Sequence, residues 1–230
     1  NLPHGPVDIP PEENTYAGSP AIRQAYGNAS GTNRECSGAA EEYASMVDKL
    51  DRQVGAIVDQ VRKLGLDKRT IIIFSSDNGH ELYYRTDKGR GRGPDCHGGV
   101  LDGTGELLDV FRGSRGRVGP NNAMANLAGL KWTSHEGGIR VPLIISWPGT
   151  LPHGKVCHSL VANYDHMASF ADLAGIRMPE GKDAVSYMDI LSGNSARQRD
   201  YVVVDHTVIT GDGWKLTQKQ NKPFLFHIGR

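Results

Sequence analysis

The chain has 230 residues, and its 26 lysines and arginines balance 26 aspartates and glutamates, so the formal net charge is zero. That balance excludes a protein that binds polyanions through bulk charge, and any attraction for an anionic ligand must be local. No apolar run approaches the ~18 residues of a membrane-spanning helix, and the length suits one large domain or two small ones.

The first 35 residues predict an irregular segment, because prolines and glycines interrupt any regular structure. His4 lies here, in Asn1-Leu-Pro-His-Gly-Pro6. Taken alone, a histidine in such a loop is more often solvent-facing than catalytic. The chain starts with Asn rather than Met and shows no signal peptide, so we expect a piece of a longer protein.

Residues 37–64 predict one long amphipathic helix. Apolar side chains recur at steps of three and four, at Tyr43, Met46, Val47, Leu50, Val54, Ile57, Val58, Val61 and Leu64. Gly65 follows, where a helix end favours a left-handed residue. We interpret this helix as scaffold.

Residues 71–74 are a continuous Ile-Ile-Ile-Phe run, typical of a short strand covered on both faces, as in the middle of a parallel sheet. Ser-Ser-Asp-Asn-Gly follows at 75–79. Polar side chains after such a strand are candidates for a site, and Asp77 and Asn78 offer the oxygen ligands that a hard cation prefers. The plainer alternative is an Asx turn that ends in Gly79.

Residues 80–129 are rich in glycine and basic side chains, which predicts a long irregular stretch. It is either a solvated insertion or a rim that attracts an anionic substrate. The Gly-Arg-Gly-Arg-Gly segment at 89–93 lacks repeats and interleaved aromatics, so we expect no nucleic-acid partner.

The remainder predicts a second strand at 143–146, a helix at 160–174 and three antiparallel strands, at 201–209, 214–217 and 224–228. We therefore expect an α/β fold, with residues 1–195 forming part of a catalytic α/β domain. Residues 196–230 would begin a small antiparallel C-terminal subdomain.

Three motifs in order resemble the sulfatases of the alkaline-phosphatase superfamily: Pro-His-Gly-Pro at 3–6, Asp-Asn-Gly at 77–79, and Lys131 five residues before Glu-Gly-Gly at 136–138. The resemblance implies an alkaline-phosphatase-like sheet flanked by helices. It further implies that Asp77 and Asn78 bind Ca²⁺ or Mg²⁺, that Lys131 holds the sulfate, and that His4 lies against it and can protonate the leaving group. His135 is a further candidate for lining the substrate site.

Such sulfatases carry Cys-x-Pro-x-Arg or Ser-x-Pro-x-Arg, whose first residue becomes the formylglycine nucleophile. None of Cys36, Cys96 and Cys157 is followed by x-Pro. Asp165 stands where the family has an Asp before a Pro-Thr-Leu-like segment, but Asp-His-Met-Ala-Ser-Phe occurs here. We therefore expect the nucleophile on a missing upstream half, and the isolated chain to be inactive.

The resemblance implies hydrolysis of a sulfate ester, on a sulfated carbohydrate or small molecule, in a periplasmic, secreted or lysosome-like compartment. Two alternatives stay open: a phosphonate or phosphate ester hydrolase of the same superfamily, and a non-catalytic binding domain that retains the fold. We also expect an apolar surface beside the strands, covered by the missing N-terminal half or by a second copy.

Overall fold

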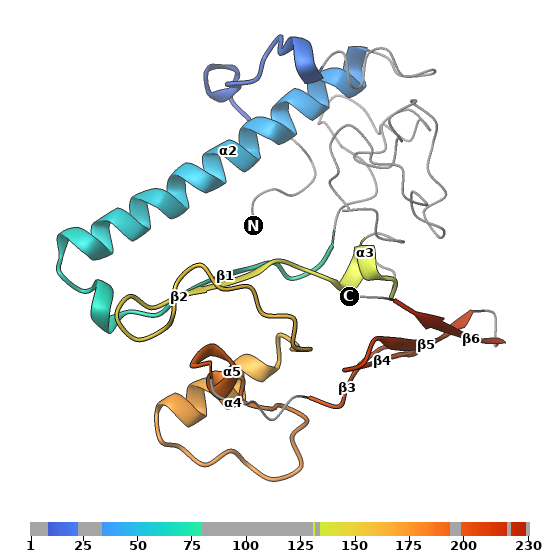
Figure 1. Cartoon of the computed structure of the whole chain (residues 1–230). Coiled ribbons are helices and arrows are strands. Elements are labelled where there is room, and N and C mark those ends of the chain that lie inside the picture. Colours follow the sequence, from blue (N-terminus) through green and yellow to red (C-terminus); the bar gives the residue numbers. More distant parts are fainter. Residues whose placement is uncertain are drawn as a thin grey trace. The chain divides into compact units, whose positions relative to one another are not determined.

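The computed structural model describes residues 9–22, 34–79, 131, 134–193, 199–219 and 222–228, without the side chains of 34–40 and 219 (Figure 1). The chain divides into two compact units. The first unit comprises Asn1–Leu64 and Phe74–Leu143, and the second comprises Gly65–Ile73 and Ile144–Arg230. The predicted domain boundary at residue 195 does not coincide with this division and stays a prediction.

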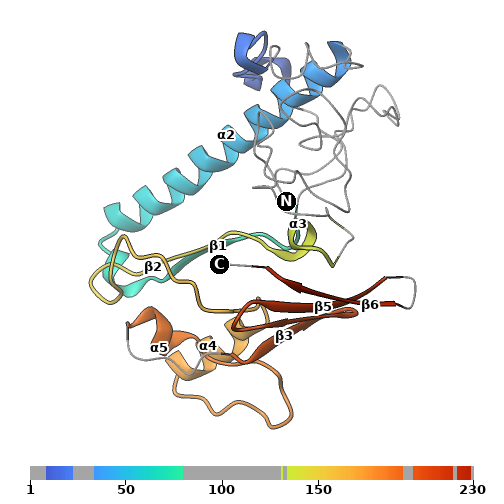
Figure 2. The same cartoon turned by 45° about the vertical axis from the view of Figure 1, so that its right-hand side comes forward.

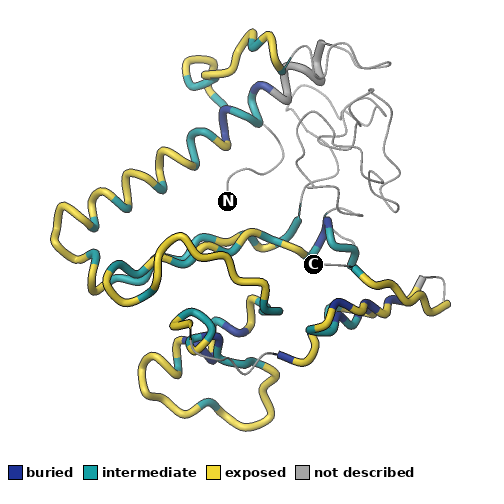
Figure 3. Tube along the Cα trace, in the orientation of Figure 1, coloured by how far each residue is buried: buried dark blue, intermediate teal, exposed yellow. Residues whose placement is uncertain are grey.

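The first unit is dominated by the helix α2 (Arg34–Lys63), which confirms the predicted scaffold helix. The segment that carries the short helix η1 (Pro11–Glu13) packs on its first half. The Tyr16 amide donates to Ser45 Oγ at 3.1 Å and the Gly18 amide to the Glu41 carboxylate at 3.0 Å. The second half of α2 is largely exposed in Figure 3. No helix in the described ranges is long and apolar enough to cross a membrane.

The strands β1 (Ile72–Ser75) and β2 (Leu143–Ser146) form a two-stranded sheet. The Ser75 hydroxyl donates to the Pro142 carbonyl, and four residues later the Gly79 amide donates to the Gly138 carbonyl, so the two segments run in opposite directions. The two strands are therefore antiparallel, whereas the apolar run suggested the middle of a parallel sheet; what covers the apolar surface beside them stays a prediction. Residues 72–74 are half-buried. An unbroken apolar run indicates that both faces of a strand are apolar, but it shows neither the direction of the strand nor what covers it.

In the second unit, the helix α4 (Asp165–Leu173) is followed by the short helix α5 (Met188–Leu191). The predicted helix at 160–174 begins five residues too early. The chain turns just before α4, where the Asp165 amide donates to the Ala162 carbonyl at 2.9 Å and the Asp165 carboxylate accepts from the Ala162 amide at 2.8 Å. That reciprocal pair of bonds fixes the start of the helix.

The second unit ends in an antiparallel sheet in the order β3 (Tyr201–Val204), β4 (Thr207–Thr210), β5 (Trp214–Lys219) and β6 (Lys222–His227), seen in Figure 2. This confirms the predicted meander. The predicted single strand at 201–209 is two strands, because Asp205 adopts a left-handed φ of 51° and starts a tight turn. Aspartate tolerates that conformation better than the valines around it.

The two faces of this sheet differ in exposure. On the inner face the β3–β5 residues Val202, Thr207, Ile209, Lys215 and Thr217 are buried, whereas Phe224 and Phe226 of β6 are exposed. The outer face is exposed and carries Tyr201, Val203, Trp214, Leu216 and Leu225. Both faces thus carry apolar side chains, and the inner face also buries the polar side chains of Thr207, Lys215 and Thr217.

Candidate functional site

The Asp77–Asn78 pair lies directly after β1, on a turn of the first unit. Ser76 Oγ donates to the Asn78 carbonyl at 3.0 Å, and the Asn78 amide donates to Asp77 Oδ1 at 3.0 Å. The Asn78 side-chain nitrogen donates to the Gly79 carbonyl at 2.9 Å. The turn thus has the local side-chain-to-backbone bonds of an Asx motif.

These bonds leave two oxygens uncommitted. In the part of the chain that the structure describes, Asp77 Oδ2 and Asn78 Oδ1 accept no hydrogen bond, and Asp77 is exposed. A carboxylate oxygen and an amide oxygen on adjacent residues fit a hard divalent cation. No group of three or more His, Cys, Asp or Glu side chains that could hold a metal occurs among the described residues. Asp77 and Asn78 would therefore supply only part of a cation's ligands.

The second predicted motif lies at the short helix α3 (Glu136–Ile139). His135 precedes it as N-cap, and its carbonyl accepts from the Gly138 and Ile139 amides at 2.8 and 3.1 Å. Gly137 and Gly138 are buried, whereas His135 and Lys131 are half-buried.

The structure joins the two motifs through their backbones. The Gly79 amide donates to the Gly138 carbonyl at 2.8 Å, and Ser75 Oγ donates to the Pro142 carbonyl at 2.9 Å. A Cβ built on Gly79 would lie 1.8 Å from the Gly137 carbonyl oxygen. We call this contact the 79–138 junction. It brings the Asp77–Asn78 turn against the glycine pair of the lysine motif, although some sixty residues separate them in sequence.

The structure does not show where the remaining predicted site residue, His4, or the side chains of two of the three cysteines lie. His4 lies outside the described residues, as do Cys96 and the basic stretch from residue 80 to 130. The backbone of Cys36 is helical, but its side chain is not described. Cys157 is exposed and is a free thiol.

Sequence reasoning missed a buried ion pair in the second unit. Asp165 and Arg199 form a two-pronged contact through Nε and Nη2 of the arginine, and their side chains are 2% and 7% exposed. The remaining guanidinium donors reach the Asp183 carbonyl at 2.6 Å, the Tyr164 hydroxyl at 3.2 Å and the Tyr201 carbonyl at 3.3 Å. Every donor of Arg199 therefore has an acceptor, as a structural arginine requires.

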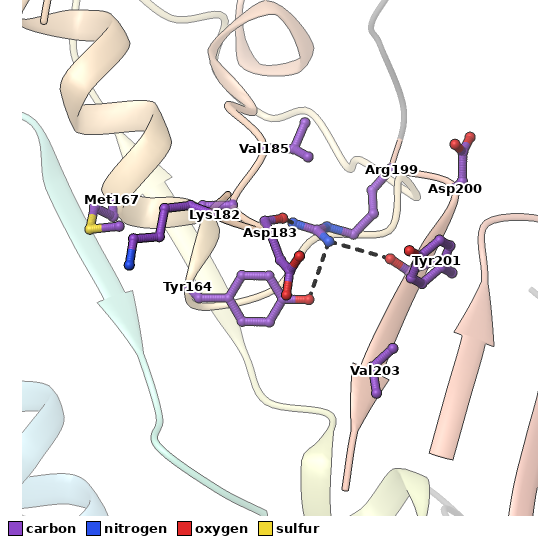
Figure 4. Close-up of a pocket in the computed structure, with 10 residues that line it drawn as sticks. Tyr164, Met167, Lys182, Asp183, Val185, Arg199, Asp200, Tyr201 and Val203 are labelled. Carbon is purple, nitrogen blue, oxygen red and sulfur yellow. Dashed lines mark hydrogen bonds between the residues drawn. The ribbon is translucent and has the colours of Figure 1, made fainter. Parts of the chain in front are cut away.

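A pocket of about 480 Å³ lies beside this pair (Figure 4). Its lining includes Tyr164, Met167, Lys182, Arg199 and Val203. Burial raises the pKa of the Tyr164 hydroxyl above its ordinary value, and Arg199 partly opposes that rise. Because the arginine is fully committed to protein acceptors, this pocket offers a ligand no free guanidinium. A sequence signal was absent, since Arg199 belongs to none of the motifs.

Comparison with known proteins identifies the family. The family model Sulfatase matches residues 2–176. The arylsulfatase of Klebsiella aerogenes is 32% identical, covering 58% of this chain and 29% of the relative. Human steryl-sulfatase is 31% identical over 67% of the chain and 22% of its own length, and mouse N-acetylgalactosamine-6-sulfatase is 28% identical over 65% and 22%. The chain thus spans less than a third of these relatives.

Solved structures agree on the fold. Ps i-CgsB, in complex with k-i-k-neocarrahexaose, aligns with 99% of this chain and 42% of its own, at a TM-score of 0.62 and 23% identity. A sulfatase of glycosaminoglycan metabolism in Bacteroides thetaiotaomicron aligns with 99% of this chain and 46% of its own, at a TM-score of 0.59 and 17% identity. The predicted α/β fold is confirmed, and the chain belongs to the sulfatase family.

Proposed function

We propose that this chain forms part of a cation-dependent sulfuric ester hydrolase that acts on a sulfated carbohydrate. The observation that carries the proposal is the 79–138 junction. It links the turn bearing Asp77 and Asn78 to the motif that begins at Lys131. Family membership supports sulfate-ester hydrolysis as the reaction.

Each residue has one role in this proposal. Asp77 Oδ2 and Asn78 Oδ1 hold Ca²⁺ or Mg²⁺, which would supply positive charge next to the ester oxygens. The Lys131 ammonium binds a sulfate oxygen as a point charge, which suits a tetrahedral anion better than a planar fork does. His4 donates the proton to the departing alcohol, because an imidazole titrates near neutral pH. His135 lines the substrate site.

The net reaction breaks the bond between sulfur and the ester oxygen. The oxygen of water ends on sulfur, and a proton ends on the released alcohol. The 230 residues contain neither Cys-x-Pro-x-Arg nor Ser-x-Pro-x-Arg, so the formylglycine nucleophile of this proposal is not among them.

Two groups of relatives bear on the substrate. Four mammalian relatives are named N-acetylgalactosamine-6-sulfatase, and one solved structure contains D-glucosamine-2-N,6-O-disulfate at a TM-score of 0.51. Other relatives are named for aryl and steryl sulfates. We favour a sugar because carbohydrate names occur among both the relatives and the structures.

The test is hydrolysis of an aryl sulfate by the natural protein that contains this chain, compared with aryl phosphate and aryl phosphonate. We expect turnover of the sulfate, its loss on chelation, and its return with Ca²⁺ or Mg²⁺. The Asp77→Ala variant should lose both activity and cation binding. Faster turnover of the phosphonate would favour the phosphonate hydrolase, and no turnover of any ester would favour a binding domain.

A further inference from the structure

We propose that Gly79 is a positioning residue, which sets the Asp77–Asn78 pair against the lysine motif through the 79–138 junction. The inference rests on the proposed function, because it assigns the pair to a cation and the motif to a sulfate. It predicts that cation binding and sulfate binding weaken together when the junction is displaced.

The requirement for glycine at position 79 is spatial. Gly79 is not among the described glycines that have a positive φ, so its backbone conformation is open to any residue. A side chain is instead excluded by backbone atoms, since a Cβ would lie 1.8 Å from the Gly137 oxygen, 2.7 Å from the Gly137 carbonyl carbon and 2.9 Å from the Gly138 Cα. Backbone atoms cannot rotate away as a side chain can. An added methyl group must therefore push the two segments apart.

The turn that bears the pair is held at both of its ends. Ser75 Oγ fixes the near end to the Pro142 carbonyl at 2.9 Å, and the Gly79 amide fixes the far end to Gly138 at 2.8 Å. Between them, Ser76 Oγ holds the Asn78 carbonyl at 3.0 Å. A shift at Gly79 is therefore transmitted to Asp77 and Asn78, which lie between two fixed points.

Lys131 lies on the other side of the junction. Its motif includes the buried Gly137 and Gly138, which meet Gly79 directly. Moving this contact changes the distance between the lysine and the cation pair without changing any charged group. This separates Gly79 from Asp77, Asn78 and Lys131, whose side chains would contact ligands themselves.

The main experiment uses Gly79→Ala in the natural protein that contains this chain, with calcium titrated calorimetrically and KM measured with an aryl sulfate. We expect calcium to bind at least tenfold more weakly and KM to rise severalfold. Saturating calcium should restore most of kcat but not KM, which a general loss of folded protein would not produce. Gly55→Ala is the matched control. Gly55 lies on α2, and a Cβ added there would meet nothing within 4 Å, so this variant should change neither calcium affinity nor KM.

Ser76→Ala covers the case in which Gly79→Ala does not fold, because it removes one hydroxyl bond and adds no atoms. We expect calcium affinity to fall about threefold. Ser192→Ala is its control, since it also removes an exposed serine bond of 3.0 Å to a backbone carbonyl, in the second unit; calcium affinity should not change.

Asp77→Ala separates the two proposals. If Asp77→Ala abolishes calcium binding while folded Gly79→Ala and Ser76→Ala bind calcium as the unmodified protein does, the positioning role is wrong and the proposed function stands. If Asp77→Ala also leaves calcium binding unchanged, the cation assignment itself is wrong.

Discussion

Asp77 and Asp165 are two aspartates with opposite surroundings. The Asp165 carboxylate is buried and accepts from the Ala162 and Val185 amides at 2.8 and 2.9 Å as well as from Arg199. Asp77 is exposed and accepts one described hydrogen bond, from the next residue. Asp77 comes directly after the strand β1, and Asp165 begins the helix α4.

The two carboxylates differ in whether an oxygen remains available to bind a ligand. Both carboxylate oxygens of Asp165 accept hydrogen bonds from protein donors, so its negative charge stabilises the fold and is not available to a ligand. Among the described residues, no donor reaches Asp77 Oδ2, so this carboxylate retains an oxygen that a ligand could use. A residue that is to bind a ligand must leave part of its bonding capacity unused within the protein.

The largest effect should come from Asp165→Asn. The substitution leaves the buried guanidinium of Arg199 without its counter-charge, which costs about 3–5 kcal/mol of unfolding free energy. Urea denaturation of the purified protein measures it. Asp77→Asn is the control and should change stability by less than about 0.5 kcal/mol. Equal losses for the two variants would refute the contrast.

Lys131→Ala should produce the next largest effect, on catalysis. Removing a charge that stabilises the transition state is expected to lower kcat/KM for an aryl sulfate by about 10²–10³-fold. Lys155→Ala, at an exposed lysine of the second unit, should leave kcat/KM unchanged. A full loss of folded protein in Lys131→Ala would instead place this lysine with Arg199 as a structural residue.

A substitution on the exposed outer face of the β3–β6 sheet should have a smaller effect, on self-association of the chain. Leu225 and Leu216 are 63% and 47% exposed, and we expect the isolated chain to pair through this face. Leu225→Glu should weaken self-association about tenfold, since one buried leucine contributes about 1.5–3 kcal/mol. Sedimentation measures it, with Val156→Glu as the exposed aliphatic control. A chain that stays monomeric at high concentration would leave this face to another segment of a longer protein.

The smallest effect should be a loss of stability at alkaline pH. Burial raises the pKa of Tyr187 and of Tyr164 above the ordinary value. The contribution of these two tyrosines to the free energy of unfolding is therefore complete below pH 10, and it is lost as the pH rises through their pKa values in the folded state. Urea midpoints measured from pH 8 to 11 should decline above pH 10. Tyr187→Phe should make the decline shallower, and an unchanged slope would contradict the assignment.

Sequence patterns predicted the elements that depend on interactions between residues close together in the chain. The stripe from Tyr43 to Leu64 predicted α2 because side chains three and four apart share a face. The left-handed φ of Gly65, 67°, confirms the predicted helix end. The turn at Asp205 was missed, because one aspartate among valines gives too weak a turn signal.

Distant contacts could not be predicted from pattern alone. The motif resemblance identified Asp77, Asn78 and Lys131, but no sequence rule shows that Gly79 excludes a Cβ. Arg199 was missed because its partner Asp165 lies 34 residues away, and the pair forms only once the second unit has folded. The roles of His4, Asp77, Asn78, Lys131 and His135 stay predictions.

The β3–β6 sheet has a consequence for the order of folding. Each strand pairs with the next one along the chain, so its contacts close short loops and form on the microsecond scale of hairpins. The Asp165–Arg199 contact joins residues 34 apart, and we expect it to form after the hairpins, because a longer loop costs more entropy to close. Until that contact forms, we expect the inner face with Val202 and Ile209, which is buried in the finished fold, to be solvated as well as the outer face. That interval is when a newly made chain is most exposed to wrong partners, and chaperones that recognise apolar strands would act there.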